Sequence, residues 1–191
     1  GFTIQDGSAE NGGGIYTNNA SPTIKDCIIR SNTATDGVGM YIISGNPSID
    51  NVVIRNNSAS NHAGAIYFGL IPESATISNS LIISNHAVGY AGACMMYEAS
   101  ITADNVTVTN NTSDNGVEAG GGFFMWGGGG TQVATFSNSI IYDNVPDQIA
   151  LHWDNDNIVV NVSYSDIEGG ESSISNNDEG TVNWNSGNID I

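Results

Sequence analysis

Six aromatic residues recur along the chain, and each follows an apolar residue of a short β-prone stretch: Tyr16, Tyr41, Tyr67, Tyr97, Trp126 and Trp153. Because successive side chains of a strand point to opposite faces, we expect all six rings to point outward in one row. Aromatic rings bind sugars through their faces, and an exposed apolar strip marks an interaction surface. We therefore predict a ligand-binding face made of these rings. The alternative is that the rings stack on one another and only stiffen the sheet.

The acidic segment Asp154-Asn155-Asp156-Asn157 is the candidate metal site. Its alternating side-chain oxygens are typical of the start of a calcium loop, so Asp154 and Asp156 are the predicted ligands of Ca²⁺. The segment lacks the glycine turn and the distal bidentate Glu of such a loop, and an Asx-rich turn is the alternative interpretation. The sequence indicates no other cofactor.

No combination of side chains predicts catalysis. The histidines His62, His86 and His152 are scattered, and we expect His152 to point inward as a packed, hydrogen-bonded imidazole. Asp166 and Glu168 have the alternate spacing that would place them on one face of a strand. A solvated edge is the simpler interpretation of that pair, so we assign no catalytic residue.

The charge of the chain is strongly negative and excludes several partners. It has 20 acidic and 3 basic residues, which gives a formal net charge of −17. This charge would repel nucleic acid and anionic lipid, whereas divalent cations would be attracted. No apolar run has the length of a transmembrane helix, so we expect no membrane insertion by this segment.

The candidate residues must be positioned by an irregular repeat of roughly 27 residues. We call residues at the same place in successive copies a column. Stacked amides can hydrogen-bond from one copy to the next, so two polar columns, six residues apart, are predicted to be structural. The first contains Asn32, Asn57, Asn85, Asn111 and Asn144, and the second contains Asp26, Asn51, Asn79, Asn105 and Asn138.

Short β-prone stretches lie between the polar columns, and their alternate residues point the same way. A second strand in each copy follows a glycine-rich corner and carries the aromatic residue. We read Cys27 and Cys94 as core-filling thiols rather than a disulfide, because they lie in different copies. The residues predicted to be buried are Ile24, Ile29, Ile49, Ile54, Ile77, Ile82, Val108, Phe136 and Ile141.

A unit of short strands and corners cannot bury a core alone, so it must coil on its neighbours as one turn of a solenoid. The sequence therefore predicts an all-β fold, a right-handed parallel β-helix of about six to seven turns that spans residues 1–191 as a single domain. In this alignment Lys25 falls beside Asp50, and Arg30 falls beside Arg55.

Three features carry a resemblance to a known family. They are Gly12-Gly13-Gly14-Ile15-Tyr16, Ser21-Pro22-Thr23-Ile24 and the strands that end in Asn; later turns add Tyr164-Ser165-Asp166-Ile167-Glu168-Gly169-Gly170 and Gly187-Asn188-Ile189-Asp190. The pattern resembles the right-handed parallel β-helix repeats of the pectin-lyase-like superfamily, and it is similar to the repeats of bacterial polymorphic outer-membrane and surface proteins. The resemblance covers nearly the whole chain and implies the fold, whereas fold alone does not fix function.

The resemblance also implies one possible activity, because enzymes of this superfamily cleave acidic polysaccharides. A carbohydrate-active enzyme, either a polysaccharide lyase or a glycoside hydrolase, or the remnant of one, is therefore the alternative function. Lyases of this kind use calcium with an Arg or Lys base, and the only basic residues in the chain are Lys25, Arg30 and Arg55. Arg30 and Arg55 share a column and could bind a carboxylate together, although a solvated face is the simpler interpretation. The adjacent aspartates and the Gly-His-Gly motif of the hydrolases are missing from the sequence.

We therefore expect a non-catalytic extracellular or cell-surface β-helix module for adhesion, carbohydrate binding or structural assembly. Its expected partner is a polysaccharide or a neighbouring surface protein. Both ends of the chain read as incomplete turns, so we expect a fragment of a longer secreted protein. Uncovered turns carry unpaired backbone groups, which would allow self-association end to end.

Overall fold

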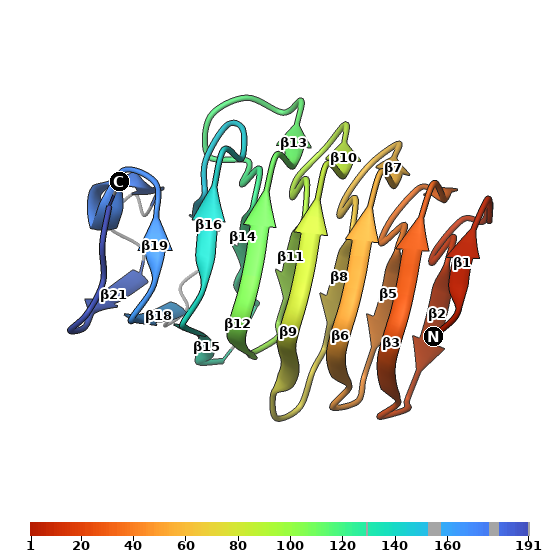
Figure 1. The fold of residues 1–191 in the computed structure, drawn as a ribbon, viewed down its shortest axis with the longest axis horizontal. Helices are drawn as coiled ribbons and strands as arrows, with labels where there is room; N and C mark the ends of the chain where they lie inside the picture. Colours follow the sequence, from red (N-terminus) through yellow and green to blue (C-terminus); the bar gives the residue numbers. More distant parts are fainter. Residues whose placement is uncertain (129, 153–157, 176–179, 191) are drawn as a thin grey trace.

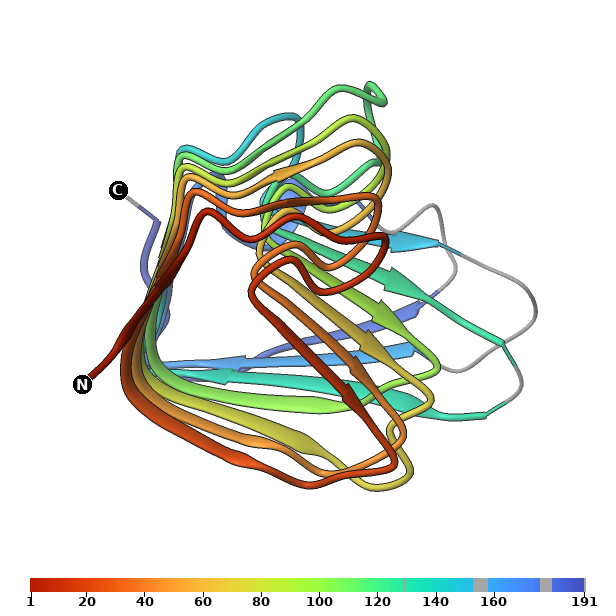
Figure 2. The ribbon, with the colours of Figure 1, turned by 90° about the vertical axis from the view of Figure 1, so that its right-hand side faces the viewer.

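The computed structural model describes residues 1–128, 130–152, 158–175 and 180–190. Nearly all regular structure in this part is β-strand, in parallel sheets that form a solenoid of about seven turns (Figure 1). Viewed along the axis from the first turn, the chain runs clockwise as it recedes, so the solenoid is right-handed (Figure 2). This is the usual hand of parallel crossovers. The predicted parallel β-helix is confirmed.

Three sheets form the walls of the solenoid. The long-strand sheet contains β1 (Thr3–Gln5), β3 (Thr23–Arg30), β6 (Ser48–Arg55), β9 (Ala75–Ile83), β12 (Ile101–Thr109), β15 (Gln132–Ser137), β16 (Ile140–Tyr142), β18 (Ile158–Ser163), β19 (Asp166–Ile167) and β21 (Gly180–Trp184). The seven-stranded sheet contains β2 (Ile15–Asn18), β5 (Met40–Ile43), β8 (Ile66–Gly69), β11 (Cys94–Tyr97), β14 (Phe123–Trp126), β17 (Ile149–His152) and β20 (Ile174–Ser175). The short-strand sheet contains β4 (Thr33–Ala34), β7 (Ser58–Ala59), β10 (His86–Ala87) and β13 (Thr112–Ser113), and a 3-10 helix, η1 (Gly170–Ser173), precedes β20.

The long strands bend at one fixed position in each turn, where a residue other than glycine has a left-handed backbone. The backbone angle φ at this position lies between 50° and 54° in Asp26, Asn51, Asn79, Asn105 and Asn138. Asn and Asp tolerate this conformation better than other non-glycine residues. All five side chains are exposed. This polar column therefore sets the bend of the wall in addition to forming contacts between turns.

The core is a continuous apolar column inside the sheets. All nine residues predicted to be buried are buried, with relative exposures of 8% or less. Equivalent residues stack through direct strand pairing, as Ile29 does with Ile54 and Ile54 with Ile82. Both cysteines are free thiols: Cys94 is buried, and Cys27 packs against the edge of the core. No turn has an independent core, so each turn depends on its neighbours for burial.

A ladder of buried asparagines runs beside this core, and we call Asn32, Asn57, Asn85, Asn111 and Asn144 the Asn ladder. The Nδ2 of each of the first four members donates to the Oδ1 of the next Asn in the ladder at 2.9 to 3.0 Å. The same Oδ1 also accepts the backbone N–H of that donating Asn. Each Nδ2 donates in addition to a backbone carbonyl, for example Asn57 to Ile29. The predicted stacking of these amides at one corner is confirmed. The side-chain oxygen of each of the last four members accepts two hydrogen bonds, and each side-chain nitrogen donates at least two.

The Asn ladder continues into a different set of side chains at its C-terminal end. Asn144 Nδ2 donates to Gln148 Oε1 at 2.7 Å, and Gln148 Nε2 donates to Glu168 Oε2 at 2.7 Å. At the opposite end Asn32 Oδ1 accepts the backbone N–H of Gly7 at 2.9 Å. The ladder therefore begins on a backbone donor and ends on a carboxylate.

Replacing Ile54 with Ala should lower the free energy of unfolding by about 2 to 5 kcal/mol, because the turns on either side cannot fill the void. Ile28→Ala is the matched control, since Ile28 lies on the outer face of the same sheet with 37% relative exposure. Its cost should stay near the roughly 0.5 kcal/mol of a surface substitution. Urea denaturation measures both variants, and equal costs would contradict the assigned core.

Replacing Asn85 with Ala removes the acceptor of the Asn57 side chain and backbone N–H, and also the donor to Ile54 O. Each buried group left without a partner costs about 1 to 3 kcal/mol, so the loss should exceed that of one ordinary hydrogen bond. The control is Asn183→Ala, because Asn183 is exposed and donates only to Asn161. A loss in Asn85→Ala no larger than in the control would show that the ladder does not stabilise the solenoid.

Candidate functional site

Three tyrosines of the seven-stranded sheet form a parallel stack, which we call the tyrosine stack: Tyr16, Tyr41 and Tyr67. Their centroids are 5.7 and 4.7 Å apart, with interplanar angles of 4° and 14°. Direct pairing of β2, β5 and β8 holds the three residues in register. The stack begins with Tyr16, which is 53% exposed, and Tyr41 and Tyr67 are partly buried. The ring faces are turned to one another, so mainly the edges and hydroxyls point outward.

The prediction of one row of six rings is wrong beyond Tyr67. Met95, and not Tyr97, pairs with Tyr67, whereas Tyr97 pairs with Gly69 and with Trp126. Tyr97 and Trp126 thus lie two positions further along their strands. A shift of two residues keeps a side chain on the same face, so the apolar alternation could not reveal it. The remaining predicted residues, Trp153 of the row and the metal ligands Asp154 and Asp156, lie outside the described residues.

A second aromatic group, which the sequence did not reveal, continues the face beyond the tyrosine stack. Phe124 and Met95 are buried on the outer side of the sheet in a small apolar cluster that Tyr67, Tyr90 and Trp126 partly cover. Tyr90 stacks on Phe124, with centroids 4.4 Å apart. Tyr90 comes from a corner between β10 and β11, so the strand pattern gave no signal for it.

His152 belongs to this outer group, so the expectation that it points inward is wrong. It pairs with Trp126 along the strands, and its ring meets the indole at 5.2 Å and 78°. The inward residue of β17 is its neighbour Leu151. We call the tyrosine stack together with Tyr90, Tyr97, Phe124, Trp126 and His152 the aromatic face.

Burial on the aromatic face favours the neutral forms of its titratable groups. It raises the pKa of Tyr67 and of Tyr41, with a smaller contribution from the charges of nearby acidic groups. Burial lowers the pKa of His62, which Asp36 partly offsets, and His62 Nδ1 accepts the backbone N–H of Tyr90 at 3.0 Å. The hydroxyls of Tyr41 and Tyr67 therefore remain protonated donors near neutral pH.

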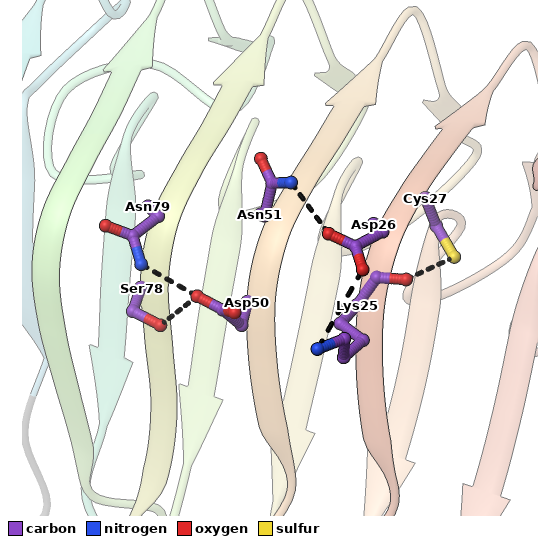
Figure 3. Close-up of polar contacts among 7 residues, drawn as sticks. All are labelled: Lys25, Asp26, Cys27, Asp50, Asn51, Ser78 and Asn79. Atoms are coloured by element: carbon purple, nitrogen blue, oxygen red, sulfur yellow. Dashed lines mark hydrogen bonds and ion pairs between the residues drawn. The ribbon is translucent and has the colours of Figure 1, made fainter. Parts of the chain in front are cut away.

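The outer face of the long-strand sheet carries a second regular arrangement, shown in part in Figure 3. Strand pairing places Lys25, Asp50, Ser78, Asp104 and Ser137 in one column, which we call the carboxylate column. The predicted pairing of Lys25 with Asp50 is confirmed in register, although the Lys25 Nζ lies 3.9 Å from Asp26 instead.

Two carboxylates of this column are held in the same way by the next strand. Asp50 Oδ1 accepts Ser78 Oγ and Asn79 Nδ2, both at 2.8 Å (Figure 3). Asp104 Oδ1 accepts Ser137 Oγ at 2.6 Å and Asn138 Nδ2 at 2.7 Å. Hydrogen bonds from Asn79 and Ser78 lower the pKa of Asp50, and bonds from Ser137 and Asn138 lower the pKa of Asp104. Both groups are therefore firmly anionic.

The candidate lyase arginines are adjacent, as predicted, because Arg30 pairs with Arg55. Arg30 Nε donates to Gln5 Oε1 at 2.9 Å, so one of the two guanidinium groups already has a neutral partner. Neither arginine has an ion-pair partner within the described part of the chain. The guanidinium groups of this pair could donate hydrogen bonds to the carboxylate of a ligand.

A cavity with a volume of about 820 Å³ lies near the C-terminal turns. Asp143, Asp147 and Glu168 contribute carboxylates to its wall, and Ser172 and Ser173 contribute hydroxyls. Burial raises the pKa of Asp147, although backbone N–H groups, including that of Glu118 at 2.7 Å, oppose the shift. The cavity is polar and acidic, and of its three carboxylate residues only Glu168 was named from the sequence.

Across the described ranges, no three His, Cys, Asp or Glu side chains gather closely enough to hold a metal ion. Burial raises the pKa of the Cys94 thiol, which keeps it protonated and unreactive. The described residues include no helix that is long and apolar enough to cross a membrane.

Comparison of the chain with protein-family models, with curated protein sequences and with solved structures gives no significant match.

Carbon-detected NMR titration should give Asp50 and Asp104 midpoints below the ordinary aspartate range and an Asp147 midpoint above it. Asn79→Gly removes the main donor to Asp50 and keeps the left-handed backbone that glycine tolerates. The Asp50 midpoint should then rise, while that of Asp104 stays unchanged.

The sign of the stability effect follows from the lowered pKa values. Below the ordinary aspartate pKa the unfolded chain binds more protons at these two positions than the folded chain does. Their stabilising contribution is therefore present above that pKa and is lost as the pH falls through the folded-state midpoints. Unchanged Asp50 titration in Asn79→Gly would contradict the assigned hydrogen bond.

Proposed function

We propose that this chain is a non-catalytic β-helix module of an extracellular or cell-surface protein, and that it binds polysaccharide through the aromatic face. The observation that carries this proposal is the regular tyrosine stack, whose rings repeat at the same place in three successive turns. A repeating array suits a repeating ligand, because each turn offers the same group to the next unit of a polymer.

The hydroxyl groups of the tyrosine stack support this role. Within the described residues, none of the hydroxyls of Tyr16, Tyr41 or Tyr67 is hydrogen-bonded to another protein group, and the raised pKa values of Tyr41 and Tyr67 keep those two protonated. An exposed phenol can donate to and accept from a sugar hydroxyl, while its ring edge contacts the apolar side of the sugar. The ligand would therefore contact mostly edges and hydroxyls rather than open ring faces.

The order of the aromatic face also supports binding. Each ring of the tyrosine stack is held by its neighbour, and Tyr90 is held between Phe124 and His62. Side chains that are already fixed lose little conformational entropy when a ligand arrives. The net charge of −17 would repel uronic-acid polymers, so neutral polysaccharides are the better candidates for this face.

Affinity electrophoresis through gels that contain neutral polysaccharides would test the proposal. Tyr41→Ala and Trp126→Ala should each weaken the affinity measured from retardation by about fivefold or more, because losing one aromatic contact costs on the order of 1 kcal/mol or more. Tyr142→Ala is the matched control, since Tyr142 is a partly exposed tyrosine on the long-strand sheet. Retardation that is absent in the wild type, or equally reduced in all three variants, would refute the assignment of the aromatic face.

The acidic cavity favours a second candidate function, a glycoside hydrolase or the remnant of one. A carboxyl group with a raised pKa beside ionised carboxylates is what acid-assisted cleavage of a glycosidic bond requires. Asp147 has that raised pKa, and Glu168 is held by Gln148 in the same wall. Depolymerisation assays on pectin, alginate and sulfated and neutral polysaccharides separate the two functions. Turnover by the wild type that disappears in Asp147→Asn would show that the chain is an enzyme and would refute the non-catalytic assignment.

A further inference from the structure

We infer that the outer face of β6, β9, β12 and β15 binds a linear, amine-bearing polysaccharide that lies across the strands and contacts Asp50 and Asp104. This surface belongs to the long-strand sheet and is separate from the aromatic face on the seven-stranded sheet. The inference extends the proposed polysaccharide binding to a second ligand class. Because it rests on different residues, it can fail independently of that proposal.

The spacing of the two carboxylates is the first argument. Asp50 pairs with Ser78, Ser78 with Asp104, and Asp104 with Ser137, so the two carboxylates lie two strands apart. Adjacent strands of a sheet lie about 4.8 Å apart, which places the two carboxylates about 9.6 Å from each other along the solenoid axis. The intervening positions carry hydroxyl groups.

The fixed orientation of the carboxylates is the second argument. Each Oδ1 accepts two hydrogen bonds from the next strand, from a serine hydroxyl and from an asparagine amide. Each Oδ2 accepts no hydrogen bond from any described residue and is left for a ligand. A cation that binds there meets an acceptor that is already oriented, so little ordering cost remains.

The surroundings are polar and nearly free of positive charge. Thr76, Thr102 and Thr135 form an adjoining outward column, two residues before the carboxylate column in each strand. Lys25 is the only cation in the carboxylate column, and it lies at the N-terminal end beside Asp26, at 3.9 Å. Arg55 follows Asp50 at the far end of β6, beyond the bend at Asn51. Lys25 is also the direct neighbour of Asp50 in the column, and its charge makes a small contribution to the lowered pKa of Asp50. The position between Asp50 and Asp104 carries a hydroxyl and no positive charge.

The spacing of the two carboxylates and their negative charge together indicate the class of ligand. In an extended β-linked chain whose successive sugars are rotated by half a turn, amino groups on one side recur at every second sugar. That repeat is close to two strand spacings, so consecutive amines on one side can reach Asp50 and Asp104 together. Ammonium-to-carboxylate hydrogen bonds are stronger than neutral ones, and the net charge of −17 attracts a cationic polymer.

Isothermal titration calorimetry with glucosamine oligomers of increasing length tests the inference. The disaccharide offers one amine to the face, whereas the trisaccharide offers two. Affinity should therefore rise by at least about tenfold between these lengths, since the second contact is intramolecular. The same oligomers with acetylated amines are neutral and should show no such step. A smooth rise with length, or an equal step for the acetylated series, would overturn the inference.

The double variant Asp50→Asn with Asp104→Asn should abolish the step, because each amide keeps the accepting oxygen but loses the charge. The control is Asp6→Asn with Glu10→Gln, which changes the net charge equally at two exposed positions off this surface. The left-handed backbone of Asp6 also suits asparagine, so both double variants should keep the wild-type thermal midpoint.

Three outcomes would refute the inference. The step could persist in Asp50→Asn with Asp104→Asn, or it could disappear equally in the control, which would indicate unspecific charge attraction. Lysine oligomers of the same charge could bind with equal affinity and equal dependence on Asp50 and Asp104, which would assign the surface to a basic peptide. Loss of neutral-polysaccharide binding in Tyr41→Ala with an intact glucosamine step would show that the two surfaces act separately.

Discussion

The structure depends on one constraint, namely that buried amides of one turn can be satisfied only by the turn that follows. In the Asn ladder each Oδ1 accepts both the side chain and the backbone of the preceding Asn. A shift of one turn relative to its neighbour by a single residue would leave these donors buried without acceptors and would turn the core residues outward. The ladder therefore fixes register, and register fixes every column on the outer faces. The aromatic face and the carboxylate column are consequences of that alignment.

A solenoid with fixed register converts a sequence repeat into rows of identical groups at the spacing of the strands. Such rows suit extended polymers better than compact ligands, because the contacts repeat in one direction. The two outer faces differ in the chemistry that they repeat. The seven-stranded sheet presents ring edges and protonated hydroxyls, whereas the long-strand sheet presents anchored carboxylates and hydroxyls. The acidic cavity beside η1 differs from both faces, because carboxylates and hydroxyls from several corners surround it instead of repeating along one direction.

The fold could be predicted from sequence because its determinants recur in register. The column of Ile29, Ile54 and Ile82 shows why. The sequence repeat and the alternation along each strand both predict that these residues are buried. The aromatic face was predicted only in part, since Tyr97 lies two residues from its expected partner and alternation is unchanged by that shift. Asp50 was identified only as the neighbour of Lys25, and Asp104 was not found, because serines occupy the equivalent positions on the strands between and beyond them. Tyr90 comes from a corner, where no repeat constrains the position of a side chain.

The direction of the amides in the Asn ladder gives the solenoid an electrical polarity. In every amide of the row the C=O points toward the N-terminal turns and one N–H points toward the C-terminal turns, while the second N–H donates to a backbone carbonyl. The aligned C=O dipoles therefore add in the way that peptide dipoles add along a helix. One reversed amide would bring donors against donors on one side and acceptors against acceptors on the other, so the row keeps or loses its orientation as a unit. Through Gln148, the positive end of this aligned row meets Glu168, whose negative charge opposes the accumulated dipole.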